Sequence, residues 1–510
     1  MGVLNQGSLL QGLAADLVDG NYSTAAVWTT ALLAGALALS LLLTPRLDPR
    51  EPPVVKPTIP LVGHIIGIIR HQSDYHRIIH NANPTKHIAT LPMLNGKMYT
   101  IYDPHLVQTA LRSRIASFEP FGIDFAQKTF GLSKETFVKV RRPNVFGDFN
   151  DAIHSSFQAP MLHKMNVHFL ASISAKMDPI SFGTALYGDH DPFGPQPHLV
   201  DDIWLFEESI PYFLLSLFPS ITMPKAYRAR SKLQALMGKY YSEGHDINDP
   251  TTSQLVKNRA GALRKHGFTG NEVGQLEVIL PNVATLNAVP TFYWMLLFIF
   301  ERPELVNRLR KEVEAAAVVS NSEGKRTATF DIASFDAKLP LLISCYRETM
   351  RLSNHSVSMR RIMQDMTITG ADGQSYLLKK GVDLQLPAGV THHDRSAWGQ
   401  DFDEFDAERF LQKTRDAETE RRRKAAYFPF GGGRHLCPGR NFAFAEILGF
   451  MAVLVLGFDV EPLGMRFGEM KMLGGQLASG TVRPEKHGKG LGGKITRRSG
   501  WENVDWRFEC

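Results

Sequence analysis

The residues best placed to do chemistry form a glycine-rich turn with one cysteine, FPFGGGRHLCPGRNFAFAEI at residues 428–447. Cys437 stands just before a predicted helix, 439–457, and a helix N-terminus favours a thiolate through its free N–H groups and its dipole. The glycines at 431–433 let the backbone approach a flat, bulky group. No CxxC or HxxxH pattern lies nearby, so zinc or an iron–sulfur cluster lacks a ligand set. Haem brings four ligands of its own and needs one axial thiolate; a buried structural cysteine is the alternative.

The run from Phe430 to Gly439 resembles the haem-binding loop of the cytochrome P-450 superfamily, and its phenylalanine, glycine and cysteine positions all match. The resemblance implies that Cys437 is the axial iron ligand of haem b, iron protoporphyrin IX. His435 stands where the family most often has arginine, and the arginine beside it is expected to share the contact with a haem propionate. The cofactor-binding residues that the resemblance implies are Phe430, Gly433, Arg434, His435, Gly439 and, from an upstream segment, Arg360.

Two further segments resemble family motifs that support the haem loop. Glu348-Thr-Met-Arg351 is similar to the ExxR pair, and FDAERF, which contains Arg409, is similar to the PERF segment. A Glu and an Arg three residues apart on a helix usually form a surface pair that contributes little. Here the preceding LPLLISCY is apolar, so buried charges would need each other. The resemblance implies a structural triad of Glu348, Arg351 and Arg409.

The longest apolar element, 271–300, is interrupted by Glu277, Asn282 and two prolines, which favours a helix through the centre of a large domain over a membrane span. Its sequence resembles the sterol 7α-hydroxylase and prostacyclin synthase branch of the family. Most family members carry an acid–threonine pair in this helix, which relays protons to bound oxygen. Counting back from Arg302-Pro303, which resembles the family's HP pair, places Asn287 at the threonine position, so the pair is absent.

Asn287 is the catalytic candidate in this helix. Pro290 has no N–H, so the carbonyl of Leu286 loses its helical partner, and the helix is expected to open there. A free carbonyl beside the Asn287 amide is able to hold a water, which gives a proton route without an acid or an alcohol. An asparagine that merely satisfies the helix break is the alternative.

Length and composition limit the number of domains and the kinds of partner that this chain could have. A chain of 510 residues can form one very large domain or two to three ordinary ones. Its three cysteines cannot make a disulfide framework. The formal net charge of +6 is mild and does not argue for nucleic acid, although it allows an acidic protein partner or an anionic membrane surface.

The predicted fold class is mainly α, a single large haem domain with small β-sheets, as the resemblance implies. Hydrophobic periodicity predicts helices at 224–242, 303–318, 339–352 and 439–457. Strand-like pieces lie at 365–370, 375–379 and 383–387. The two most polar stretches, 320–329 and 412–424, are interpreted as surface loops or frayed helix ends.

The N-terminus is predicted to hold a membrane anchor. Residues 25–43 carry no charge, and a helix of that length spans roughly 28 Å, close to the thickness of a bilayer core. Acidic residues precede it and basic residues follow it, which places the bulk of the chain in the cytosol, on the endoplasmic reticulum. A cleaved signal peptide is the alternative. The predicted organisation is a lumenal tail at 1–24, the anchor at 25–43, a proline-rich linker at 44–62 and the haem domain at 63–510.

The resemblance implies a monooxygenase that uses O2 to oxidise a lipophilic small molecule, since an axial thiolate favours O–O cleavage. No flavin or nicotinamide fingerprint is evident, so electrons are expected from NADPH through a separate cytochrome P-450 reductase with an acidic docking face. The basic run at 421–424 would face it, or be a solvated charged loop. The closing RRSGWENVDWRFEC resembles filamentous-fungal members, which points to secondary metabolite biosynthesis. Alternatives are a haem-thiolate isomerase or dehydratase, which needs no external electrons, and a non-catalytic haem-binding protein.

Overall fold

The structure is a computed structural model, and it describes residues 26–32, 34–35, 47–58, 62–93, 96–176, 181–322, 325–411, 416–477, 479–485 and 492–510. Residues 26–32 and 34–35 are helical, within the stretch predicted to be the membrane anchor. The predicted tail, the rest of the anchor and part of the proline-rich linker lie outside the described residues. The anchor and the proposed domain boundaries therefore stay predictions.

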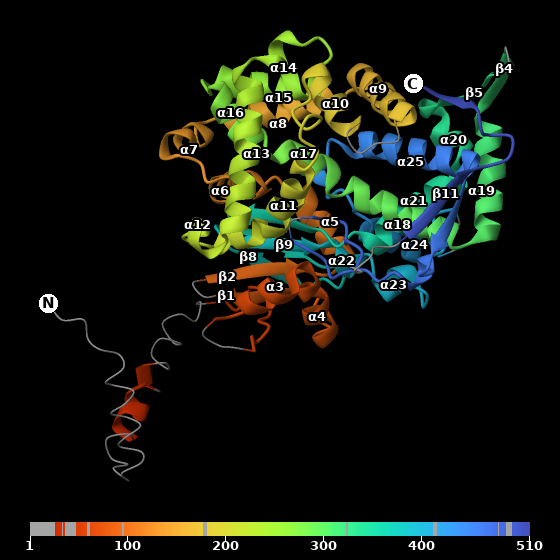
Figure 1. The fold of residues 1–510 in the computed structure, drawn as a ribbon. Helices are drawn as coiled ribbons and strands as arrows, with labels where there is room; N and C mark the ends of the chain where they lie inside the picture. Colours follow the sequence, from red (N-terminus) through yellow and green to blue (C-terminus); the bar gives the residue numbers. More distant parts are fainter. Residues whose placement is uncertain are drawn as a thin grey trace, which may run out of the picture.

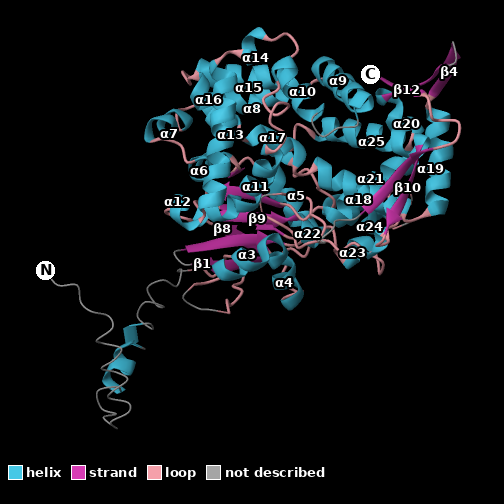
Figure 2. Cartoon of the chain, viewed as in Figure 1, coloured by secondary structure: helices cyan, strands magenta, loops and turns pink. Residues whose placement is uncertain are grey.

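Helices make up most of the fold, and the strands form small sheets at its periphery (Figure 2). Three consecutive helices run from the upper left of the molecule through its middle (Figure 1): α16 Gly270–Glu277, α17 Ile279–Thr285 and α18 Ala288–Phe300. The first begins with a capping box in which Thr269 and Glu272 each accept from the other's backbone N–H. These helices occupy the predicted central element.

The helices before this central element share one hydrophobic core, in which Phe206, Phe213, Met237 and Tyr241 are almost completely buried. The core forms because each helix turns one apolar face inward. The helices that contribute to this core are α6 Glu119–Phe130, α7 Lys134–Val140, α8 Val145–Ser156, α9 Ala159–Lys176, α10 Ser181–Tyr187, α11 Leu199–Leu215, α13 Pro224–Ser242 and α15 Gln254–Lys265. Two short helices of the same part of the chain, α12 Pro219–Thr222 and α14 His245–Asn248, add no hydrophobic residue to it.

A second core lies between α18 and the helices that follow it in sequence. Two of these helices, α19 Pro303–Ala316 and α21 Pro340–Ser353, start with a proline, which needs no N–H partner at that position. The helix after the cysteine, α25 Arg440–Gly457, is buried along most of its length and packs against α18 through stacked rings of Phe292 and Phe450. The shorter helices after α19 are α20 Phe335–Lys338, α22 Ala388–Thr391, α23 Arg395–Trp398 and α24 Ala417–Ala426.

The strands form four sheets. The largest has the order β1-β2-β9-β6-β3, a second has the order β12-β5-β4, and two are hairpin-like pairs, β7-β8 and β10-β11. In the order of the chain, helices α3 Ile65–His71 and α4 Tyr75–Ala82 precede the first strand of the largest sheet, and α5 Pro104–Arg112 follows its second strand. The strands are β1 Ile88–Met93, β2 Gly96–Ile101, β3 Ala116–Ser117, β4 Val318–Ser322, β5 Lys325–Asp331, β6 Val357–Ile362, β7 Met366–Thr369, β8 Ser375–Leu378, β9 Asp383–Pro387, β10 Phe458–Leu463, β11 Gly492–Arg497 and β12 Val504–Glu509.

Most of the elements predicted from periodicity are confirmed. The helix expected at 224–242 is α13, the one at 339–352 is α21, and the one at 439–457 is α25. The three predicted strands are β7, β8 and β9. The mainly helical fold class with small sheets is confirmed as well.

The interpretation of 320–329 as a loop or frayed helix end was wrong. These residues lie in the hairpin of β4 and β5, and β5 pairs in parallel with β12, where Trp506 faces Ala328 and Phe508 faces Phe330. The partner strand is far away in sequence, so no local pattern indicates the pairing. The second polar stretch was also misjudged, because residues 417–424 belong to the regular helix α24, which the side chain of Asp416 caps.

Within the described residues, two helical stretches are long and apolar enough to cross a membrane, Gly270–Phe300 and Arg440–Gly457. Both contribute to the cores described above, with Met295, Ile299 and Leu448 almost completely buried. The first agrees with the prediction of a central helix.

Candidate active site

The cysteine turn connects α24 to α25. The N–H of Cys437 donates to the carbonyl of Phe430 (3.1 Å), which folds the intervening glycines into a loop. Burial raises the pKa of the Cys437 thiol, whereas hydrogen bonds from the N–H groups of Gly439 and Arg440 act in the opposite direction. The start of α25 thus provides the thiolate-stabilising donors that the sequence predicts, and a coordinated metal ion deprotonates such a thiol. Cys345 and Cys510 are also free, but neither lies on a glycine turn.

Two of the three consecutive glycines have left-handed backbone conformations, Gly431 with φ +69° and Gly433 with φ +64°. A Cβ on Gly433 would lie 1.8 Å from the carbonyl oxygen of Leu111, the penultimate residue of α5. The loop therefore fits against α5 only because this position has no side chain.

We expect Gly433→Ala to abolish haem incorporation, because the backbone of either the loop or α5 must move to make room for the methyl group. Gly373→Ala is the matched control: Gly373 has a similar φ of +80° but nothing within 4 Å of its would-be Cβ. That control carries only the conformational cost of about 1–2 kcal/mol. Haem content per protein, measured from the reduced CO-bound spectrum, distinguishes the two variants. Equal haem loading in both would show that close packing at Gly433 is unimportant.

Basic side chains gather beside the loop, and no carboxylate among the described residues pairs with them. Arg360 on β6 is 3% exposed. Within the part of the chain that the structure describes, its guanidinium donates only to the carbonyls of Met359 (2.7 Å) and Gly432 (3.3 Å), and its Nε has no partner. Burial lowers the pKa of Arg360 to about 10. The pKa of His435 falls to about 4 because of burial and the nearby charges of Arg360, Arg434 and His154.

This arrangement fits haem. A buried guanidinium with an unpartnered nitrogen calls for an anion, and haem has two propionates. The donor set contains a single cysteine, and no group of three metal-ligating side chains occurs among the described residues. His154 on α8 lies near His435, a neighbour that the sequence did not establish. Bound haem supplies the activation of O2. Cys437, Arg360, Arg434 and His435 are the residues of this chain that would hold it.

Glu348, Arg351 and Arg409 lie in direct contact, deep in the fold behind the cysteine loop. Arg351 Nε and Nη2 donate to the two oxygens of Glu348 (2.7 and 2.8 Å), and Arg409 Nε donates to Glu348 Oε1 (2.9 Å). Arg351 and Glu348 are completely buried. Asp401 adds a second carboxylate to Arg409 (2.8 Å), so the two guanidiniums and two carboxylates balance in charge.

The central helix opens where Pro290 predicts, because α17 ends at Thr285 and α18 starts at Ala288. Asn287 lies in this break and is exposed to open space, although it belongs to the middle of the fold. Its Oδ1 accepts hydrogen bonds from the N–H groups of Gly480 (2.8 Å) and Thr481 (3.0 Å). Two N–H donors fix the amide orientation, so the Nδ2 group is left to face the open space.

Further contacts link Asn287 to the cysteine loop. A Cβ on Gly480 would lie 3.2 Å from both Asn287 Oδ1 and Asn354 Nδ2. Asn354 Nδ2 in turn donates to the carbonyl of Pro429 (3.1 Å), next to the loop's first residue. The helix break and the cysteine loop therefore border a common region. Val283 and Val289, on either side of the break, are about half exposed.

Sequence reasoning missed the segment 479–483, which holds the helix break from the other side. Trp294 Nε1 donates to the carbonyl of Val482 (2.8 Å). Arg483 forms ion pairs with Glu207 and Glu208 of α11. The available signal was the pair of glutamates within an otherwise apolar helix, IWLFEESIPYFLL, because buried charges of this kind need a partner.

Comparison with known proteins identifies the family. The family model for cytochrome P450 matches residues 204–487. A cytochrome P450 monooxygenase of Gibberella zeae is 36% identical over 487 residues, which cover 91% of this chain and 92% of the relative. The cytochrome P450 monooxygenase nodJ of Hypoxylon pulicicidum is 26% identical, covering 82% and 84% of the two chains. A human 7-alpha-hydroxycholest-4-en-3-one 12-alpha-hydroxylase is 25% identical, covering 84% and 90%. The chain therefore belongs to the cytochrome P450 family of monooxygenases, which makes it an oxidoreductase that uses haem and a redox partner.

Proposed function

We propose that this protein is a membrane-anchored fungal monooxygenase that inserts one oxygen atom of O2 into a lipophilic small molecule during secondary metabolite biosynthesis. The second oxygen atom leaves as water, and two electrons come from NADPH through a separate cytochrome P450 reductase. The observation that supports the substrate class best is the exposure of Val283 and Val289 in the middle of the molecule, at 53% and 50%. Apolar side chains exposed inside a fold line a space suited to an apolar ligand.

Aromatic side chains add to this apolar surface. Phe118 precedes α6 and lies against His435 of the cysteine loop, with ring centroids 6.0 Å apart, and it also contacts Phe121 and Phe146. The ring cluster thus connects α6 with the cationic side of the haem site. Two fungal relatives and a human enzyme named for a steroid substrate support a polycyclic or similarly lipophilic substrate.

Membrane attachment rests on two features. One is the uncharged N-terminal stretch, and the other is the turn around α12, where Leu217, Phe218 and Ile221 are 86%, 64% and 77% exposed. An exposed apolar group of this kind is unfavourable in water and suits a lipid surface. Together they support attachment to the endoplasmic reticulum membrane with the haem domain in the cytosol.

The basic residues of α24 are less available to a reductase than the sequence suggested, because acidic side chains already pair with them. Arg421 pairs with Glu418 (2.9 Å), Arg422 with Asp394 (2.8 Å) and Lys424 with Glu420 (3.4 Å). Nearer the cysteine loop, Arg347 and Arg440 line a hollow of about 360 Å³ together with Phe430 and Leu436. We place the docking of an acidic reductase surface at this hollow, since it adjoins the loop that holds Cys437.

The experiment that tests the function compares metabolite extracts of fungal strains with and without the gene, and then supplies the accumulated compound to the purified enzyme. We expect a product heavier by one oxygen atom, formed only when reductase, NADPH and O2 are all present. Product formed at the same rate without NADPH would replace the proposal by the isomerase alternative. Haem binding without any turnover would favour a non-catalytic haem protein.

Asn287 is proposed as the residue that handles the proton on the oxygen-binding side of the haem. Its Nδ2 faces the open space and is able to donate to a water held beside the helix break. Asn287→Leu removes this donor and the contacts to Gly480 and Thr481. We expect product per NADPH consumed to fall roughly tenfold, the value of about 1.4 kcal/mol that one hydrogen bond contributes, while peroxide rises and haem content holds.

Asn287→Asp separates the two roles of the side chain. The carboxylate still accepts from the N–H groups of Gly480 and Thr481, but it no longer offers an N–H to the open space. Uncoupling in both variants supports proton handling by Asn287. Uncoupling in Asn287→Leu alone would assign the residue to holding the 479–483 segment, and unchanged coupling in both would remove it from the mechanism.

A further inference from the structure

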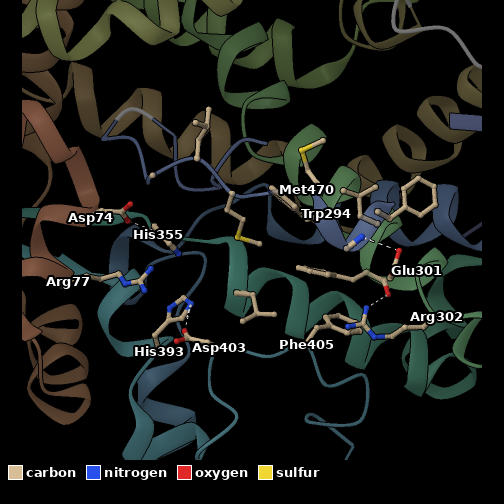
Figure 3. A pocket seen from close by; sticks show the side chains of 18 residues that line it. Asp74, Arg77, Trp294, Glu301, Arg302, His355, His393, Asp403, Phe405 and Met470 are labelled. Atoms are coloured by element: carbon tan, nitrogen blue, oxygen red, sulfur yellow. Dashed lines mark hydrogen bonds and ion pairs between the residues drawn. The ribbon is translucent and has the colours of Figure 1, made fainter. Parts of the chain in front are cut away.

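A second cavity, of about 440 Å³, lies at the C-terminal end of α18 (Figure 3). Five separate segments line it: the start of α4, residues 294–302, the end of α21 with His355, residues 393–405, and residues 467–474. None of its lining residues belongs to the cysteine loop or to the helix break. Its volume is within the usual range for small-molecule sites.

One end of the cavity is polar and contains a buried nitrogen without a partner. The side chain of His355 is 6% exposed, and its Nδ1 lies 2.9 Å from Asp74 Oδ1. The other oxygen of Asp74 accepts from the N–H of Gly475 (2.8 Å), so this carboxylate is fully engaged. His355 Nδ1 is hydrogen-bonded to Asp74, and His355 Nε2 has no hydrogen-bond partner among the described residues. A buried polar atom left unpaired costs about 1–3 kcal/mol, which a ligand group at this point recovers.

Two guanidinium groups that line the cavity also lack a carboxylate. Among the described residues, neither Arg77 nor Arg302 lies within ion-pair distance of an acidic side chain. Arg302 Nη1 donates to the carbonyl of Phe298 (2.7 Å), its guanidinium lies 4.8 Å from the ring centre of Phe405, and burial lowers its pKa. The neighbouring Glu301 is already bound by Arg466 (2.7 Å) and by the N–H of Gly468 (3.0 Å). Unpaired cations in a half-buried cavity favour an anionic ligand.

The surface between the two polar ends is apolar. Trp294, Leu297, Met470 and Met472 lie there, and the indole N–H of Trp294 is already used by Val482. The indole therefore offers only its ring, and the methionines adapt to the shape of a chain or a ring. Figure 3 shows Asp74, Arg77, His355 and His393 at one side of the cavity, Glu301 and Arg302 at the other, and Trp294 and Met470 between them.

We propose that this cavity is a second ligand site, separate from the haem site, for a small lipophilic carboxylate. The acid group contacts the Arg77 guanidinium and His355 Nε2, the buried nitrogen without a partner, while Asp74 holds the imidazole ring in place through Nδ1. The hydrocarbon part lies along Trp294, Met470 and Met472. A medium-chain fatty acid and an acidic lipophilic metabolite share this chemistry.

Photocrosslinking of the full-length holoenzyme tests the site. The probe is dodecanoic acid with a diazirine near its ω end, and an azole that coordinates haem iron blocks the haem site throughout. We expect crosslinks to peptides that contain residues 294–302 or 467–474, and we expect an excess of unlabelled dodecanoate to suppress them. Crosslinks confined to α11 or α17, or crosslinks that form only in a parallel sample without the azole, would show that the acid occupies only the haem site and would overturn the proposal.

Two comparisons test the polar end of the site. Arg77→Gln is expected to weaken probe binding roughly tenfold or more, as for the loss of a hydrogen bond to a charged group, whereas Arg70→Gln on α3, outside the cavity, leaves it unchanged. The diazirine probe with an alcohol in place of the carboxylate is expected to bind weakly to the wild type. Equal labelling of wild type and Arg77→Gln, or equal labelling by acid and alcohol, would rule out a carboxylate site. An acidic compound from the fungal extract that competes better than dodecanoate would identify the metabolite as the natural ligand.

Discussion

Replacing Cys437 by serine is expected to eliminate the thiolate-type Soret band of the reduced CO complex and to lower turnover by at least ~100-fold, or about 2.7 kcal/mol in barrier. Serine is close to cysteine in size, so the hydrogen bond from its N–H to the carbonyl of Phe430 should persist and the loop should keep its shape. The loss then reports the ligand atom and not a misfolded loop. The CO difference spectrum and product formation measure the two effects.

Cys510→Ser is the matched control, because Cys510 is an exposed free thiol at the chain end. It should retain the wild-type spectrum and turnover. A thiolate-type band that survives in Cys437→Ser would assign the iron ligand to another residue. Cys345 is the less suitable thiol, since burial holds its pKa far above the ordinary value.

Glu348→Gln is expected to leave little haem-loaded protein. The substitution removes the charge shared by Arg351 and Arg409, both buried, and breaking a buried pair from one side costs about 3–5 kcal/mol. That is a large fraction of the ~5–15 kcal/mol that stabilises a typical domain. Asp401 still neutralises Arg409, so Arg351 bears most of the loss. Haem yield per cell and the midpoint of thermal unfolding of any recovered protein measure the effect.

Glu418→Gln provides the control with the same residue types and spacing. Glu418 and Arg421 also lie three residues apart on a helix, but their side chains are 62% and 67% exposed. An exposed pair of this kind contributes little, so yield and unfolding should stay at wild-type levels. Similar yields for Glu348→Gln and Glu418→Gln would mean that burial does not make the ExxR pair essential for this fold.

The sequence alone predicted the elements whose information is local. The 3.6-residue periodicity located α13 and α21 to within a residue or two, and Pro290 predicted the break before α18. The cysteine turn predicted haem because the chemistry of one thiolate on a glycine loop leaves few alternatives. The comparisons then confirmed the family.

Long-range pairing could not be predicted. The hairpin of β4 and β5 looked like a loop because its residues are polar, and pairing with the distant strand β12 extends it into a three-stranded sheet. Likewise, nothing near Asn287 in the sequence indicates that Gly480 and Thr481 hold its amide oxygen. A side chain's neighbours from remote segments decide which of its atoms remain free for chemistry.

The sequence motifs, through the family resemblance that they carry, predicted the fold class, the candidate thiolate Cys437 and the residues of the buried charge triad, because each motif is a local run of residue types along the chain. Only the tertiary structure decided that the Asn287 Nδ2 group faces the open space, that no carboxylate among the described residues pairs with the buried Arg360, and that His355 and Arg77 line the same second cavity. These features depend on which distant segments pack together. The free-energy cost of an unpaired polar group depends on how deeply the group is buried and on how many hydrogen-bond partners it has nearby. Both are fixed only when the chain has folded.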